Sequence, residues 1–176
     1  MSFDVDTLDR ATEPEFAAAV GPLFEDAPRF LGRLAAARPF GSAERLFARA
    51  EQIALEMPED EQIELIDAHP RLGAPPSTVS AMSHREQGYD RDTTEAIVEL
   101  DRLNEQYERR FGFRFCVFVA GRPRSALVPV LREALAADRD QEIRRALHDV
   151  VAIARDRFER AESGATAAAR PREGAA

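Results

Sequence analysis

Most of this chain consists of apolar residues at helical spacing, and proline or glycine separates one such segment from the next. Capping signals agree with this division, because Thr12 and Glu15 match a capping box and Ser42 precedes another amphipathic segment. The helices predicted in this way cover residues 12–23, 28–37, 42–57, 59–68, 80–88, 92–111, 125–137 and 139–162. The pattern therefore predicts an all-α fold, a single compact bundle of about seven to eight helices.

One segment has β character instead. Residues 113–119, with the sequence Phe-Arg-Phe-Cys-Val-Phe-Val, alternate in polarity at first and are rich in β-branched and aromatic side chains. The chain has no obvious partner strand for it, so we expect an extended, buried connector at 113–119. Residues 1–162 are predicted to form one domain, and 163–176, which are small and polar, a disordered tail.

Charge and cysteine content exclude several classes of protein. The net charge is −8, and the chain contains arginine but no lysine. We therefore expect no basic surface that would bind nucleic acid or an anionic membrane. The apolar stretches are too short to span a bilayer. Cys116 is the single cysteine, which excludes an internal disulfide. Neither terminus carries a secretory or peroxisomal signal, and we expect a cytoplasmic protein.

An imidazole and a carboxylate are the candidate reactive groups. His69 directly precedes Pro70, which ends the predicted helix there, and Glu86 lies on a short helical turn further along. A helix C-terminus and a nearby carboxylate both favour the protonated ring, so the pair is expected to exchange a proton near neutral pH. Taken singly, His69 could be only a helix cap and Glu86 only a surface residue. A metal site from His69, His84 and Glu86 is a further alternative, although their spacing matches no zinc pattern.

The order of several short motifs narrows these alternatives. The motifs are Arg38-Pro39-Phe40, His69-Pro70-Arg71-Leu72-Gly73, Ser83-x-x-Glu86-Gln87, Leu103-Asn104-x-x-Tyr107, Phe111-Gly112-Phe113-x-Phe115 and Ile153-Ala154-Arg155-Asp156-Arg157-Phe158. Each is weak by itself, but in this order and spacing the chain closely resembles the 2-oxo-4-hydroxy-4-carboxy-5-ureidoimidazoline (OHCU) decarboxylases. The resemblance extends from about residue 16 to residue 158.

The resemblance also implies roles for individual residues. His69 corresponds to the catalytic histidine of the family and Pro70 to a neighbour that contacts substrate. The resemblance further implies a polar group that binds substrate and orients the imidazole, and a segment whose backbone lines the pocket. The polar group consists of Ser83, Glu86 and Gln87. The segment consists of Phe115, Cys116, Val117, Phe118 and Val119. Arg157 corresponds to a substrate-binding arginine, although Asp156 stands where an apolar residue is usual, which leaves the register of Arg155 against Arg157 open.

The activity that the resemblance implies is that of a lyase in purine (urate) catabolism. It would decarboxylate its ureidoimidazoline substrate to S-allantoin by acid–base catalysis, as a homodimer without a metal or organic cofactor. Two other functions stay open: a non-catalytic helical module that binds a ligand or partner, and a related enzyme acting on another ureide.

Overall fold

The computed structural model describes residues 4–73 and 94–169, and this part of the chain is all-α, as predicted. Its elements, in chain order, are α1 (Val5–Arg10), α2 (Glu13–Val20), the 3-10 turn η1 (Gly21–Leu23), α3 (Pro28–Ala36), α4 (Ala43–Glu56), α5 (Glu59–Ala68), α7 (Thr94–Phe111), α8 (Arg124–Ala134) and α9 (Arg139–Ala169). Within the described ranges these are eight α-helices and no strand. Residues 114–119 form the expected irregular connector between α7 and α8.

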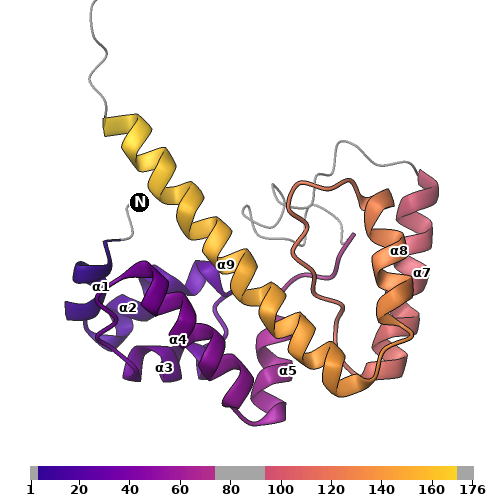
Figure 1. The fold of residues 1–176 in the computed structure, drawn as a ribbon, viewed down its shortest axis with the longest axis horizontal. Helices are drawn as coiled ribbons and strands as arrows, with labels where there is room; N and C mark the ends of the chain where they lie inside the picture. Colours follow the sequence, from indigo (N-terminus) through magenta and orange to yellow (C-terminus); the bar gives the residue numbers. More distant parts are fainter. Residues whose placement is uncertain (1–3, 74–93, 170–176) are drawn as a thin grey trace, which may run out of the picture.

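The long helix α9 organises the molecule. Figure 1 shows it crossing the fold diagonally, with α1 to α5 on one side and the α7–α8 hairpin on the other. It packs against α4, α5 and η1, and α7 packs along α8. A side chain on α9 can therefore meet groups from both halves of the fold.

Local sequence signals explain where two of the helices begin. At the start of α2 the Glu15 carboxylate accepts a hydrogen bond of 2.9 Å from the Thr12 amide, which completes the predicted capping box. At the start of α4 the Ser42 hydroxyl oxygen accepts one of 3.3 Å from the Arg45 amide. Both caps satisfy amides that the first turn of a helix leaves without a partner.

Two helix boundaries differ from the sequence prediction. The short helix α1 was not expected, and Asp4 caps it by accepting a hydrogen bond from the Thr7 amide. At the other end, α9 continues to Ala169, seven residues past the predicted boundary at 162. The added stretch contains four alanines, the residue with the highest helix propensity, so a longer helix is physically reasonable.

An aromatic cluster fixes the connector against α7. The ring of Tyr107 lies 4.5 Å from that of Phe111, 5.6 Å from that of Phe113 and 5.2 Å from that of Phe115, measured between centroids. All four side chains are buried. Pairs at these distances add to the free energy gained from burying the rings, so the connector is held by tertiary packing in place of a strand ladder.

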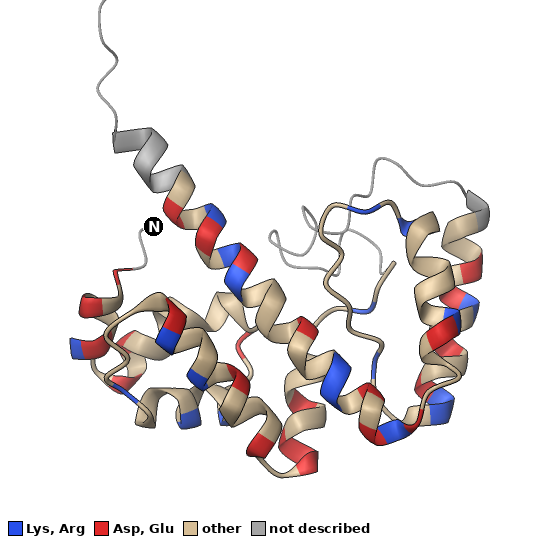
Figure 2. Cartoon of the chain, in the orientation of Figure 1, with Lys and Arg blue, Asp and Glu red and all other residues tan. Residues whose placement is uncertain are grey.

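Acidic and basic residues are interleaved along the helices (Figure 2). Arg33 on α3, for example, pairs with Glu61 on α5 at 2.6 Å, and Arg71 pairs with Asp101 on α7 at 2.7 Å. The acidic net charge is therefore distributed over the described surface. Among the described helices, none combines the length and the apolar content that crossing a membrane requires.

Candidate active site

A pocket lies where the end of α5, the connector and α9 meet. Its walls are His69, Pro70, Leu72, Phe115, Cys116, Val117, Phe118, Val119, Ile153 and Arg157. Eight of these ten were candidate site residues from the sequence, and the structure brings them together. The remaining three candidates, Ser83, Glu86 and Gln87, lie outside the described residues. The function of each lining residue stays a prediction.

His69 stands at the C-terminal cap of α5, with the extended backbone (φ −73°, ψ 139°) that the following proline favours. Its side chain is 4% exposed, and its Nδ1 lies 3.2 Å from the carbonyl oxygen of Leu65. A carbonyl can only accept, so Nδ1 carries the proton of the neutral ring and Nε2 carries the lone pair. Nε2 is buried and has no hydrogen-bond partner among the residues that the structure describes. The ring therefore presents an unprotonated nitrogen in a largely dry environment.

The expected direction of the His69 pKa shift is wrong. Burial, and after it the nearby Arg157 guanidinium, lower its pKa from 6.5 to about 4, against smaller opposing effects of Glu25 and the Leu65 carbonyl. The helix C-terminus does favour the charged ring, but removal from water costs more than that interaction returns. At neutral pH the imidazole is neutral and can act as a proton acceptor.

This shift predicts how stability depends on pH. The unfolded chain protonates His69 near pH 6.5, whereas the folded chain protonates it only near pH 4. The free energy of unfolding should therefore fall as the pH drops through this window, by up to about 3 kcal/mol from this residue. Urea unfolding at pH 7 and pH 4.5 measures the effect. The His69→Asn variant should lose clearly less stability over that interval, and an equal loss in both proteins would contradict the assignment.

The backbone around His69 is held by two side chains from other elements. Arg114, in the connector, donates from Nη1 to the carbonyl oxygens of Asp67 at 2.7 Å and His69 at 3.2 Å. Asn104, on α7, donates from Nδ2 to the carbonyl oxygen of Leu72 at 2.8 Å. These bonds satisfy carbonyls at and beyond the end of α5 and fix the segment that carries the imidazole.

Arg157 reaches the pocket from α9, and its guanidinium is 1% exposed. Nη1 donates to the carbonyl oxygens of Pro22 at 3.0 Å and Leu23 at 3.2 Å, and Nη2 donates to Glu25 Oε1 at 2.8 Å. A buried guanidinium needs such partners, because an uncompensated charge in the interior is costly. The side chain is thus anchored to η1 and to the turn that follows it.

The two arginines of the motif lie in different places in the structure. Arg155 is exposed and stacks over the ring of Phe47 at 5.1 Å, away from the pocket. Arg157 lines the pocket together with Ile153, which lies four residues earlier on the same face of α9. Of the two arginines, Arg157 is therefore the one that lines the pocket.

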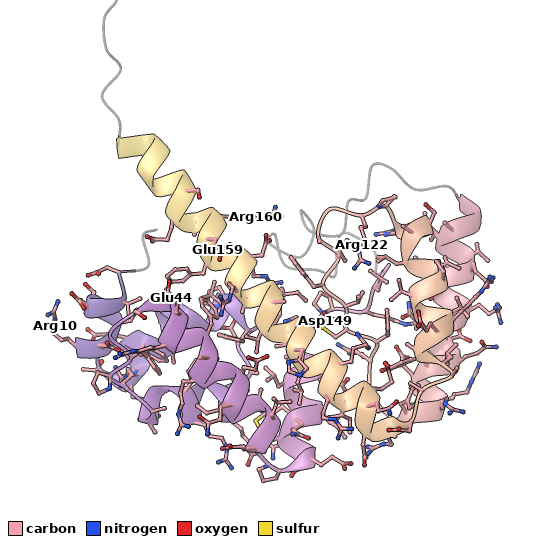
Figure 3. The ribbon with its side chains drawn as sticks, in the orientation of Figure 1. Arg10, Glu44, Arg122, Asp149, Glu159 and Arg160 are labelled. Atoms are coloured by element: carbon pink, nitrogen blue, oxygen red, sulfur yellow. The ribbon has the colours of Figure 1, made fainter. Side chains whose placement is uncertain are left out.

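Arginine side chains donate hydrogen bonds to three backbone carbonyls of the connector. Arg145 Nη1 donates to the Cys116 oxygen at 2.9 Å, and Arg122 donates to the Phe118 oxygen at 2.6 Å and the Val119 oxygen at 3.0 Å. The Asp149 carboxylate accepts from the Phe118 amide, and burial raises the Asp149 pKa. Figure 3 labels Asp149 on α9 and Arg122 at the end of the connector, both on the side of α9 that faces the α7–α8 hairpin. These bonds fix the extended segment that forms one wall of the pocket.

Sequence reasoning missed three residues of this region. Ile153 could have been found from its i, i+4 relation to Arg157, and Leu72 from its place within the His69-Pro70-Arg71-Leu72-Gly73 motif. Glu25 gave no signal, since it lies in an irregular turn far from Arg157 in sequence. Among the described residues, no group of three histidine, cysteine or carboxylate side chains could hold a metal ion. Two members of the alternative metal set, His84 and Glu86, lie outside those residues.

Comparison with known proteins gives a consistent result. A family model described as OHCU decarboxylase matches residues 9–159. The chain is 33% identical over 159 residues to the uric acid degradation bifunctional protein PucL of Bacillus subtilis, covering 89% of this chain and 32% of that protein. It is 27% identical over 149 residues to the 2-oxo-4-hydroxy-4-carboxy-5-ureidoimidazoline decarboxylase of Haloferax volcanii, covering 84% and 89%. The chain thus spans about a third of the length of the first two curated relatives, 32% and 31%.

Two solved structures share the fold. An OHCU decarboxylase crystallised in the presence of (S)-allantoin superposes with a TM-score of 0.68 at 19% identity, over 87% of this chain and 99% of that one. An (S)-allantoin synthase superposes with a TM-score of 0.65 at 21% identity, over 89% and 53%. At these identities the likeness concerns the arrangement of the helices.

Proposed function

The chain belongs to the OHCU decarboxylase family, and from this membership we propose that it converts 2-oxo-4-hydroxy-4-carboxy-5-ureidoimidazoline to S-allantoin and carbon dioxide in urate degradation. The observation that carries the proposal is the convergence of His69, the connector and Arg157 on one pocket. An unprotonated imidazole nitrogen and a buried guanidinium at the same cavity suit a small anionic substrate that gains a proton at carbon.

His69 would handle the proton. The substrate's name places a hydroxyl and a carboxylate on one ring carbon and the ureido group on the next. Loss of carbon dioxide sends the bonding electron pair into the adjacent C=N system, where the ring nitrogen takes a proton from solvent. Nε2 of His69 then accepts the hydroxyl proton and returns it to the ureido-bearing carbon, which leaves a carbonyl behind. Delivery from one face would give a single enantiomer.

Arg157 and the apolar walls would favour the loss of carbon dioxide. The guanidinium supplies positive charge and planar donors beside the position where negative charge develops. Leu72, Phe115 and Ile153 bring apolar surface to the pocket, which lowers the hydration of the leaving carboxylate. Pro70 and the connector would hold the ring between them. We propose that these side chains act without a metal or organic cofactor, as the resemblance implies.

Ser83, Glu86 and Gln87 enter the proposal through the family resemblance alone. They would bind the polar edge of the substrate, and Glu86 would orient the imidazole. The Nδ1 proton of His69 is already donated to Leu65, so a carboxylate could accept a hydrogen bond from this ring only at Nε2, once that nitrogen has taken up a proton, or act through the substrate. Assembly as a homodimer and a cytoplasmic location also belong to the proposal.

The test is chiral detection of the product. Substrate is generated freshly from urate with urate oxidase and hydroxyisourate hydrolase, and circular dichroism and carbon dioxide release are followed with and without the protein. We expect S-allantoin to form well above the spontaneous rate. Racemic product at the spontaneous rate would overturn the proposal and favour a binding module. Carbon dioxide release from another member of a ureide panel, but not from this substrate, would indicate a related enzyme.

A further inference from the structure

We propose that Glu25 is a positioning residue of this pocket, which acts by holding the Arg157 guanidinium in place beside His69. The inference rests on the proposed function for its catalytic consequence. Glu25 Oε1 accepts a hydrogen bond of 2.8 Å from Arg157 Nη2, across 132 residues of sequence. The arginine side chain is 1% exposed and the glutamate side chain 13%. The pair is therefore shielded from solvent at one wall of the cavity.

The turn that carries the Glu25 carboxylate has strained backbone angles. Glu25 and the next residue, Asp26, both have positive φ, 50° and 57°, although neither is glycine. The turn is closed by the Asp26 amide, which donates to the Gly21 carbonyl at 2.9 Å. A Cβ at position 21 would meet the Asp26 carboxylate at 2.2 Å, so the Asp26 side chain can keep its position only beside a glycine. Two consecutive left-handed residues persist only where the surroundings hold them, and such strain tends to lie at functional sites.

The same turn supplies three hydrogen-bond acceptors to the guanidinium. The Pro22 and Leu23 carbonyls accept from Nη1, and Glu25 accepts from Nη2. The carbonyls can orient the planar group, and Glu25 supplies a negative charge that offsets the charge of the guanidinium. A cation buried without a counter-charge is costly, so loss of the Glu25 charge should displace the guanidinium from its position beside His69.

Several charged groups lie near the His69 ring, and Glu25 acts on the His69 pKa in a known direction. Arg157 from α9 lowers the His69 pKa and Glu25 raises it. Arg114 from the connector donates to the His69 carbonyl, and Asp67 on α5 accepts from the Arg114 amide. Removing the negative charge of Glu25 should thus lower the His69 pKa further. Simple loosening of the turn would admit water and move that pKa in the opposite direction, toward 6.5.

The experiment compares Glu25→Gln with a matched control, Glu61→Gln. Glu61 has the same side-chain exposure of 13% and pairs with Arg33 at 2.6 Å, but Arg33, unlike Arg157, does not line the pocket. We expect Glu25→Gln to lower kcat by about 10- to 100-fold through misplacement of Arg157. KM should stay within about threefold, because the guanidinium charge that attracts the substrate is kept. Glu61→Gln should leave both constants near those of the parent protein.

The second readout needs no substrate. The His69 ring is titrated by NMR in the free protein, with His84→Gln and His148→Gln used to assign its signal. We expect a lower His69 pKa in Glu25→Gln and an unchanged one in Glu61→Gln. An unchanged or raised pKa in Glu25→Gln would overturn the proposal, even if the parent protein is an active decarboxylase. If the parent is inactive on the substrate, the proposed function fails, but the titration still decides whether Glu25 acts on the site.

A further variant covers the case in which Glu25→Gln does not fold. Glu25→Asp keeps the charge but shortens the side chain by one methylene, so the 2.8 Å contact to Arg157 cannot be kept in the same geometry. We expect this variant to fold, with a smaller loss of kcat and a His69 pKa close to that of the parent. Parent-like kcat in Glu25→Asp together with unfolding of Glu25→Gln would assign Glu25 a purely structural role and overturn the proposal.

Discussion

A chain with His69→Asn is expected to keep its helical fold and to lose turnover by about 10²–10⁴-fold, the usual worth of general acid–base assistance. The asparagine amide nitrogen can take the place of Nδ1 and keep the bond to the Leu65 carbonyl, now 3.2 Å long. No basic atom then remains where Nε2 stood. The variant therefore removes the proton acceptor while it leaves the end of α5 nearly intact.

The measurement is the rate of S-allantoin formation from fresh substrate, with far-UV circular dichroism as the check on folding. His148→Asn is the matched control, because that ring is 52% exposed and pairs with Glu51 on the surface. It should retain parent-like turnover. A His69→Asn variant that keeps more than about a tenth of the activity would exclude His69 as the main proton-handling group.

Arg157→Lys is expected to have the second largest effect, on both activity and stability. A single ammonium keeps the charge but cannot reproduce the fork that reaches the Pro22 carbonyl, the Leu23 carbonyl and Glu25. We expect kcat/KM to fall by about 10²-fold, the order found when one donor to a developing charge is removed. The free energy of unfolding should fall by about 2–3 kcal/mol, because a buried charged hydrogen-bond network is left incomplete.

The control for this variant is Arg155→Lys, two residues away on the same helix. Arg155 is exposed and stacks over the face of the Phe47 ring, so its replacement should change stability by less than about 1 kcal/mol and leave kcat/KM unchanged. Steady-state kinetics and urea unfolding measure both quantities. A larger activity loss in Arg155→Lys than in Arg157→Lys would show that the wrong arginine has been assigned to the pocket.

The helical architecture and much of the pocket wall could be predicted from sequence because local rules determine them. Pro70 forces the end of α5 at His69, so the imidazole had to stand at a helix terminus. The alternation of residues 113–119 indicated a buried extended segment, which the aromatic cluster around Tyr107 holds in place. The order of the motifs, through the family resemblance, then predicted that His69, the connector and Arg157 belong to one pocket.

Features that arise from tertiary contacts could not be predicted. The lowered pKa of His69 depends on burial by other elements, which the sequence of α5 does not encode. Glu25 reaches Arg157 only because two residues adopt left-handed backbone angles that no local pattern demanded. The arginines that bind the connector carbonyls belong to the same class, since surface and anchoring arginines look alike in a sequence.

Helix α9 fixes the distance between Arg145 and Arg157. Arg145 donates to the connector and Arg157 borders the cavity, and the step of twelve residues from one to the other corresponds to about 18 Å of helix. Adding or deleting a single residue in that interval would rotate one arginine by about 100° relative to the other, so that both could no longer reach their partners. The lengths of loops can therefore change in such a protein, but the number of residues from Arg145 to Arg157 on α9 must stay the same.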